Sequence, residues 1–173
     1  GYTELPPGKI AAAVIYLEQR EPPAPRPDPP IDGVTLERLT AADLDRYLAL
    51  FAAVGEPWLW FGRRVMPRAT LAAILADPAV EEVMVNGPDR VYELDARTAG
   101  EVELAYFGLV PEALGGGLGR WLMNRALEKA WARAPSRLFV HTCNLDHPQA
   151  LDFYLRSGFV PYGRAIEIAE QAK

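Results

Sequence analysis

A cluster of four glycines between a strand-like run and a helical pattern constrains this chain more than any other feature. Residues 101–110 read EVELAYFGLV, a run rich in β-branched and aromatic residues that is typical of a β-strand. Glycines then crowd residues 115–119, and from Leu118 to Trp131 apolar residues recur four apart, the spacing of one helix face. The order of strand, glycine turn and helix predicts an anion-binding site at the start of the helix.

The chemistry of that site is local. The first four N–H groups of a helix have no partner within it, and the aligned peptide dipoles place about half a positive charge at that end. Glycines lack a Cβ, so their backbone reaches positive φ and a ligand can approach the amides closely. A phosphate or diphosphate fits such a site. Arg120, in the first turn, would add a cationic side chain.

Two common phosphate-binding motifs fit these glycines poorly. A P-loop requires Lys-Ser or Lys-Thr after its last glycine, but Arg120 and Trp121 follow Gly119. A dinucleotide-binding motif requires G-x-G-x-x-G and an acidic residue about 20 positions further on. The spacing here is G-G-G-x-G, and the next predicted strand ends in His-Thr-Cys at residues 141–143. The sequence therefore argues against nucleotide hydrolysis and against a dinucleotide cofactor.

Length and composition bound the class of protein. With 173 residues, half of them hydrophobic, the chain is long enough for one domain with a sizeable core and short for two. It has no run of about 18 apolar residues and no signal-peptide pattern, so we expect a cytoplasmic protein without a membrane partner. A single cysteine, Cys143, suits a reducing compartment. The net charge of −5 argues against a nucleic-acid partner.

The N-terminal part predicts an addition to the main fold. Residues 9–19 read KIAAAVIYLEQ and indicate an extra strand. Residues 21–30, with six prolines in ten, indicate an extended strap of polyproline character. We therefore divide the chain into residues 1–30, packed on the main fold, and a domain of residues 31–173. The extra strand would support a homodimer.

The domain itself predicts a mixed α/β fold. A strand, a helix and a strand in series make a crossover, so the strands at 101–110 and 137–142 should be parallel neighbours. Thr40 and Asp43 form a capping-box pattern at the start of a helix, and Asp146 is the expected N-cap of the last helix. Further strands are expected at residues 34–39, 81–85, 90–95, 159–162 and 164–168, and a short helix at 70–76.

The glycine segment resembles the acyl-coenzyme A-binding segment of the GNAT superfamily of N-acetyltransferases. In that family a strand ends in a hydrophobic residue, Val and Pro, and a [Gln/Arg]-x-x-G-x-[G/A] loop leads into a long helix. Here the strand ends in Leu-Val-Pro at residues 109–111, and the motif glycines are Gly117 and Gly119. Leu114 stands where the family has Gln or Arg.

A second GNAT pattern lies near the C-terminus. The family carries Asn-x-x-Ala-x-x-x-Tyr followed by a Gly-Phe pair at the end of the helix, and His147 stands in the place of the Asn. Both motifs occur in the right order and at the right separation, so the resemblance covers residues 34–169. It implies a mostly antiparallel sheet with one splayed parallel pair and flanking helices. Four residues match the second pattern: Ala150, Tyr154, Gly158 and Phe159.

The resemblance implies transfer of an acetyl group from acetyl-coenzyme A to a primary amine of a small molecule or a protein, by direct attack in a ternary complex. It implies that Tyr154 protonates the leaving thiolate. Glu103 matches the position of the general base in some members of the family. Strand alternation would place Glu103, Ala105 and Phe107 on one face of the sheet.

The site residues follow from the same pattern. Trp58, Trp60 and Phe61 either plug the core or form a wall of the acceptor pocket. The catalytic candidates are Tyr154 and Glu103. The residues expected to contact the coenzyme are Phe107, Leu109, Val110, Leu114, Gly115, Gly116, Gly117, Leu118, Gly119, Arg120, Asn144, His147, Phe153 and Tyr154.

Several alternatives stay open at this point. One is a module that binds acyl-coenzyme A without turnover, and another is an interaction protein that uses the proline-rich strap and the aromatics at residues 58–61. Cys143 would be an acyl carrier in a ping-pong mechanism, but no partnered base is visible in the sequence. His141 and His147 lack the acidic spacing of a metal site, so we expect no metal.

Overall fold

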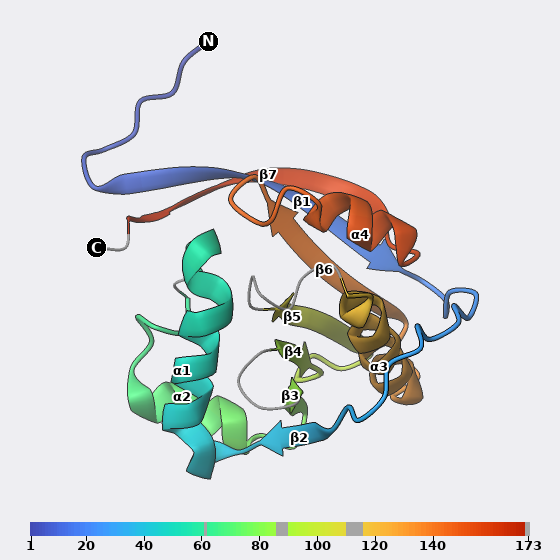
Figure 1. Cartoon of the computed structure of the whole chain (residues 1–173). Helices are drawn as coiled ribbons and strands as arrows, with labels where there is room; N and C mark the ends of the chain where they lie inside the picture. Colours follow the sequence, from blue (N-terminus) through green and yellow to red (C-terminus); the bar gives the residue numbers. More distant parts are fainter. Residues whose placement is uncertain (61, 86–89, 110–115, 172–173) are drawn as a thin grey trace.

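One seven-stranded sheet, in the order β2-β3-β4-β5-β6-β1-β7, forms the centre of the protein (Figure 1). The computed structural model describes residues 1–60, 62–85, 90–109 and 116–171. The strands are β1 Lys9–Gln19, β2 Leu36–Leu39, β3 Val80–Val85, β4 Arg90–Asp95, β5 Glu101–Leu109, β6 Arg137–Cys143 and β7 Val160–Glu170.

Helices cover both faces of the sheet and bury two separate cores. On one face α1 and α2 enclose a core around Tyr47 and Leu50, and on the other α3 covers a core around Leu122 and Met123 (Figure 1). None of the described helices is long and apolar enough to cross a membrane. The helices are α1 Leu44–Gly55, α2 Arg68–Ala76, α3 Leu118–Ala132 and α4 Ala150–Arg156, with 3₁₀ turns η1 Ala41–Asp43 and η2 Glu56–Trp58.

The expected meander and crossover form. β3, β4 and β5 pair in series as antiparallel neighbours, and β5 and β6 are parallel. The parallel register covers only the pairs from Glu101↔Arg137 to Glu103↔Phe139. Beyond that point β5 continues along β4 and β6 continues along β1. The two parallel strands therefore diverge toward their carboxyl ends, which confirms the predicted splayed pair.

The N-terminal strand lies inside the sheet. β1 pairs antiparallel with β6 on one side and with β7 on the other, and Leu17 is fully buried. It therefore joins the last two strands of the chain, while the exposed residues 1–8 lead into it (Figure 1). The division of the chain at residue 30 stays a prediction.

A β-bulge in β5 changes the faces expected from alternation. The register with β4 shifts so that Ala105 has no partner on that strand. Before the bulge Leu104 packs in the α3 core; after it Phe107 packs in the same core and Tyr106 packs on the α1 core. The prediction that Glu103 and Phe107 share a face was wrong, because the extra residue reverses the alternation between them.

The end of the chain forms one strand where two were expected. Separate strands were predicted at residues 159–162 and 164–168, but β7 runs through Gly163 and pairs with β1 along its length. The register shifts beside this point, with Tyr16 opposite Gly163 and Leu17 opposite Pro161. Tyr162 is therefore the extra residue of a β-bulge, and β7 stays continuous because β1 pairs with it on both sides of the bulge.

Two carboxyl groups lie in the core beneath α1 and α2. Glu82 and Glu93 are 2% and 1% exposed. The Tyr47 hydroxyl donates a hydrogen bond to Glu93 at 2.9 Å, and Arg63 forms an ion pair with the same carboxylate. Burial, and next the charge of Glu93, raise the pKa of Glu82 well above the usual 4.5. Burial and the charge of Glu93 therefore favour the protonated form of Glu82 in the folded protein.

The raised pKa of the Glu82 carboxyl predicts that the stability of the protein depends on pH. Because the folded-state pKa of Glu82 is raised, its contribution is fully present below about pH 4.5 and is lost as the pH rises through the folded pKa. Glutamine does not titrate, so we expect the stability of Glu82→Gln not to fall in this way. The free energy of unfolding of the variant, minus that of the wild type, should therefore increase from pH 4.5 to pH 8. Urea titrations measure it, with Glu37→Gln at the surface as the control. A constant difference would contradict the assignment.

Candidate functional site

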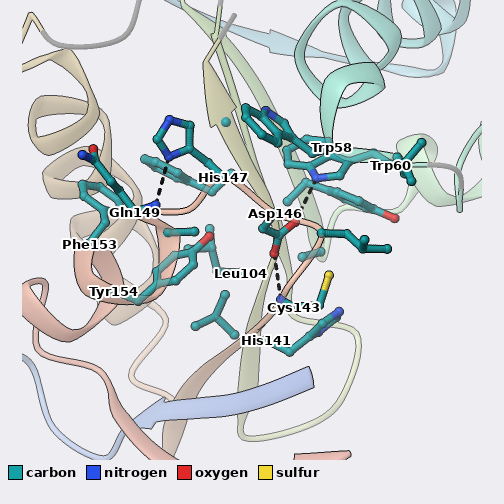
Figure 2. Close-up of a pocket in the computed structure, with 18 of the residues that line it drawn as sticks. Trp58, Trp60, Leu104, His141, Cys143, Asp146, His147, Gln149, Phe153 and Tyr154 are labelled. Atoms are coloured by element: carbon teal, nitrogen blue, oxygen red, sulfur yellow. Dashed lines mark hydrogen bonds between the residues drawn. The ribbon is translucent and has the colours of Figure 1, made fainter. Parts of the chain in front are cut away.

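A cavity of about 580 Å³ occupies the gap between the diverging strands. Its walls come from β5 at residues 104–109, from β6 at Val140, His141 and Cys143, and from the loop and helix that follow β6. Figure 2 shows Asp146 and Tyr154 pointing into it. The volume lies within the range of small-molecule sites. One end of the cavity reaches the start of α3, and the other reaches the loop after α1.

The start of α3 has the geometry expected of the glycine turn. The N-cap Gly117 is in the left-handed region, at φ 77°, and has no side chain with which to cap the helix. The first amides of α3 therefore have no partner within the helix. Gly117, Gly119 and Arg120 line the cavity at this end. A Cβ on Gly119 would lie 3.7 Å from the ring of Phe153, so the helix start and α4 are in close contact.

The structure brings together most of the residues expected to contact the coenzyme. Leu118 packs in the core instead, Gly116 is exposed beside the turn, and Asn144 pairs with β1, where its Oδ1 accepts a hydrogen bond from the Ala13 N–H at 2.8 Å. Val110, Leu114 and Gly115 lie outside the described residues. Those that line the cavity are Phe107, Leu109, Gly117, Gly119, Arg120, His147, Phe153 and Tyr154.

Tyr154 lies on α4 with its hydroxyl directed into the cavity (Figure 2). Its ring packs against Phe153 and Phe159, with centroids 5.9 and 5.8 Å away, and the residue is 7% exposed. Burial raises the pKa of the hydroxyl, and the negative charge of Asp146 raises it further. The phenol is therefore protonated at neutral pH and is a fixed proton donor.

Glu103 is not among the residues that line the cavity. Its Oε1 lies 3.9 Å from Nδ1 of His141, which does line it. Burial raises the pKa of Glu103, although a positive charge on His141 would oppose that shift. Glu103 therefore contacts His141, and only His141 of these two residues lines the cavity.

Asp146 is the central residue that the sequence analysis placed wrongly. It is not the N-cap of α4, which begins at Ala150 after Gln149. Its Oδ2 instead accepts hydrogen bonds from the Thr142 hydroxyl at 2.6 Å and from the Cys143 N–H at 3.0 Å. Trp60 Nε1 lies 3.4 Å from its Oδ1 (Figure 2). An acid three residues beyond the carboxyl end of a splayed strand was the signal that would have identified it.

The tryptophans lie at the far end of the cavity, and their role at an acceptor pocket stays a prediction. Trp58 and Trp60 line the cavity, and Trp60 also packs against Tyr106, with ring centroids 5.2 Å apart. A Cβ on Gly108 would lie 2.8 Å from the Trp60 ring, so this strand position admits only glycine. Phe61 lies outside the described residues. The wall is therefore an extension of the α1 core.

The thiol of Cys143 lines the cavity. Burial raises its pKa, and the charge of Asp146 acts in the same direction. The protonated thiol is a weak nucleophile, so the geometry does not favour an acyl-cysteine carrier. Within the described residues, no three His, Cys, Asp or Glu side chains gather in a way that would hold a metal ion.

The fold and the cavity define the class as an α/β domain with a ligand site in a splayed parallel pair. Residues 83–159, from β3 to the end of α4, match the model of the acetyltransferase (GNAT) family. The match covers a little less than half of the chain, and over this part the chain is similar to the GNAT family. A search of curated proteins finds no match.

Solved structures share the fold at low sequence identity. A GCN5-related N-acetyltransferase from Sphaerobacter thermophilus is 18% identical, with a TM-score of 0.64 over 92% of this chain and 52% of its own. A conserved protein of unknown function from Staphylococcus epidermidis is 17% identical, with a TM-score of 0.65 over 95% of this chain and 64% of its own. The chain thus spans between half and two thirds of these two proteins.

A smaller relative covers the core of the fold. An aminoglycoside acetyltransferase from an uncultured soil metagenomic sample, in complex with trehalose, is 15% identical. Its TM-score is 0.58, over 72% of this chain and 86% of its own.

Proposed function

We propose that this protein transfers an acetyl group from acetyl-coenzyme A to a primary amine by direct attack in a ternary complex. The observation that carries the proposal is the continuity of one cavity. It joins the glycine turn of α3, a protonated tyrosine and a carboxylate flanked by tryptophans. Anion binding, proton donation and amine binding are the three tasks of such a transfer, and here they lie along one path.

The donor would occupy the end of the cavity at α3. The unpaired amides after Gly117 suit a diphosphate, since the helix dipole and free N–H groups favour negative charge. The β6-facing edge of β5 is free of ladder partners beyond Glu103, so its backbone is open to the amides of pantetheine. Phe107 and Phe153 stack with ring centroids 5.5 Å apart and form the apolar floor of this section.

The acceptor would occupy the end at Trp58 and Trp60. Among the described residues, the Oδ1 atom of Asp146 has one hydrogen-bond contact, 3.4 Å from Trp60 Nε1, which leaves it room to accept from an ammonium group. Tryptophan faces bind organic cations with about 0.5–1 kcal/mol at exposed sites and more when desolvated. Glu167 of β7 adds a second carboxylate to the wall. The charge of the pocket therefore suits a cationic amine.

The proton balance involves two groups of the cavity. An amine bound as an ammonium first loses one proton to solvent. The neutral nitrogen then attacks the thioester carbonyl carbon, the C–N bond forms and the C–S bond breaks. His141 would take the proton that the nitrogen loses, with the Glu103 carboxylate 3.9 Å behind it to stabilise the imidazolium. Tyr154 would give its proton to the departing thiolate. Glu103 thus keeps its expected part in base catalysis, but acts through His141.

Two measurements test the function. Calorimetry should detect binding of coenzyme A and of acetyl-coenzyme A to the folded protein, and a thiol-release assay with a panel of primary amines should detect turnover. The panel includes polyamines, amino acids, peptides and an aminoglycoside, because the soil acetyltransferase is also described in complex with sisomicin. Absence of coenzyme binding would refute the proposal. Binding without turnover on any amine would favour the rival function, an acyl-coenzyme A-binding module.

Asp146→Asn tests the amine anchor. Asparagine keeps an oxygen for the Thr142 and Cys143 hydrogen bonds but removes the charge. Charge-assisted hydrogen bonds contribute about 1.5–3 kcal/mol, so we expect the KM for the amine to rise at least about tenfold. The KM for acetyl-coenzyme A should stay the same. Asp152→Asn, on the exposed side of α4, is the control. An unchanged amine KM would remove Asp146 from the acceptor site.

A further inference from the structure

The proline-rich strap, residues 21–30, is packed on the protein along its course. It leaves the end of β1 and passes beside α3 on the way to β2 (Figure 1). Pro23 and Pro29 rest on two glycines: a Cβ on Gly158 would lie 2.8 Å from Pro23, and one on Gly117 would lie 3.2 Å from Pro29. The strap therefore bridges the end of α4 and the N-cap of α3.

Hydrogen bonds fix the strap in this position. Asn124 Nδ2 donates to the Arg26 carbonyl at 3.1 Å and to Asp28 Oδ1 at 2.8 Å. Arg125 Nη2 binds both oxygens of Asp28 at 3.0 Å. These hydrogen bonds use the backbone of Arg26 and the side chain of Asp28. The Arg26 guanidinium therefore takes no part in holding the strap on α3.

The side chain of Arg26 reaches the carboxyl end of α4. Its Nη1 donates to the Arg156 carbonyl at 3.0 Å and lies 3.3 Å from Ser157 Oγ. Arg120 and Arg156 both line the cavity. Burial lowers the pKa of Arg26, and the positive charges of Arg120 and Arg156 lower it further. Three elements, the strap, α3 and α4, thus contribute one cation each.

Carboxylates do little to neutralise this cluster. Asp28 is engaged by Asn124 and Arg125, and Asp152 stands 3.9 Å from Arg156 with both side chains mostly exposed. Across the described part of the chain, no carboxylate lies within 4.0 Å of the Arg26 or Arg120 guanidinium. Like charges held together at the mouth of a cavity attract an anion, and arginine favours phosphate because its planar fork makes paired hydrogen bonds.

We propose that the strap is part of the acyl-donor site, and that Arg26, Arg120 and Arg156 together bind the phosphate groups of the coenzyme. The inference rests on the proposed function for the identity of the ligand. It adds a role for the strap, which positions one cation and closes the site beside Gly117. The strap is then a fixed part of the enzyme rather than a free peptide for a partner protein.

Calorimetry on the full chain tests the proposal with Arg26→Ala, Arg156→Ala and Arg20→Ala. Arg20 is the matched control, because it is exposed, pairs with Glu18 and does not line the cavity. We expect each of the first two variants to bind coenzyme A about tenfold more weakly, the loss of one charge-assisted hydrogen bond. The control should bind like the wild type. Wild-type affinity in both Arg26→Ala and Arg156→Ala would overturn the proposal.

The ligand series shows which phosphate is bound. Dephospho-coenzyme A lacks the 3′-phosphate, and pantetheine lacks all phosphates. If the cluster binds the 3′-phosphate, the effect of Arg26→Ala disappears with dephospho-coenzyme A; if it binds the diphosphate, the effect disappears only with pantetheine. An effect that persists with pantetheine would overturn the proposal, because it would come from altered folding.

The design separates this inference from the function on which it rests. If the wild type binds no coenzyme A, the proposed function fails. If it binds and the arginine variants match it, only the role of the strap fails. Should Arg26→Ala fold poorly, Arg156→Ala decides the question, since the Arg156 side chain is 65% exposed and does not anchor the strap.

Discussion

Tyr154→Phe is expected to lower kcat for acetyl transfer by about a hundredfold or more, the contribution of a general acid. The change removes one hydroxyl and keeps the ring, so the contacts with Phe153 and Phe159 persist. Binding of acetyl-coenzyme A and the free energy of unfolding should change little. Steady-state kinetics on the most active amine of the panel measure the effect.

Tyr162→Phe is the matched control for this experiment. Tyr162 lies on β7, is 46% exposed and stacks on Tyr16 away from the cavity. Its loss of a hydroxyl should leave kcat unchanged. If Tyr154→Phe keeps more than half of the wild-type kcat, the thiolate takes its proton from another source, and Tyr154 has only a packing role.

Arg63→Met is expected to destabilise the fold by about 3–5 kcal/mol, the usual cost of breaking a buried ion pair from one side. Arg63 is 8% exposed and pairs with the buried Glu93, which lies next to Glu82. Burial alone lowers the pKa of Arg63, but the charge of Glu93 outweighs it and the pKa is raised. Without the guanidinium, the Glu93 carboxylate loses its cationic partner and keeps the Tyr47 hydroxyl and the neighbouring Glu82.

Urea unfolding measures this loss, with Arg68→Met as the control. Arg68 Nη2 lies 2.8 Å from Asp45 Oδ1 in an exposed pair, for which about 0–1 kcal/mol is expected. A loss below about 1 kcal/mol for Arg63→Met would mean that water or a shifted side chain replaces the pair. Activity of the folded fraction should also fall, because Arg63 lies over the ring of Tyr106, which lines the cavity.

The sequence predicted the parts of the fold that local signals determine. The β5 run, the glycine turn and the α3 stripe each carry their own pattern, and a crossover between two strands leaves little choice but a parallel pair. The capping box of Thr40 and Asp43 formed as expected, although it begins a 3₁₀ turn that leads into α1. Motif spacing then placed Tyr154 and Gly117 at one cavity.

The features that were missed depend on distant partners. The bulge at Ala105 appears only when β5 is aligned on β4, and nothing in the composition of either strand indicates it. Asp146 was interpreted as a cap because it precedes Pro148 by two residues, but its hydrogen bonds go back to β6 and across to Trp60. The partners of the strap were likewise hidden, since Arg26 meets Arg156 from 130 residues away.

The place of β1 has a consequence for biosynthesis. Its hydrogen-bonding partners are β6 and β7, which follow it by more than a hundred residues. At a synthesis rate of about 5–20 residues per second, this strand waits on the ribosome for roughly ten seconds before either neighbour emerges. β1 is thus synthesised well before its partners and can pair only late, and a nascent chain released early would present an unpaired apolar edge to chaperones and to other chains.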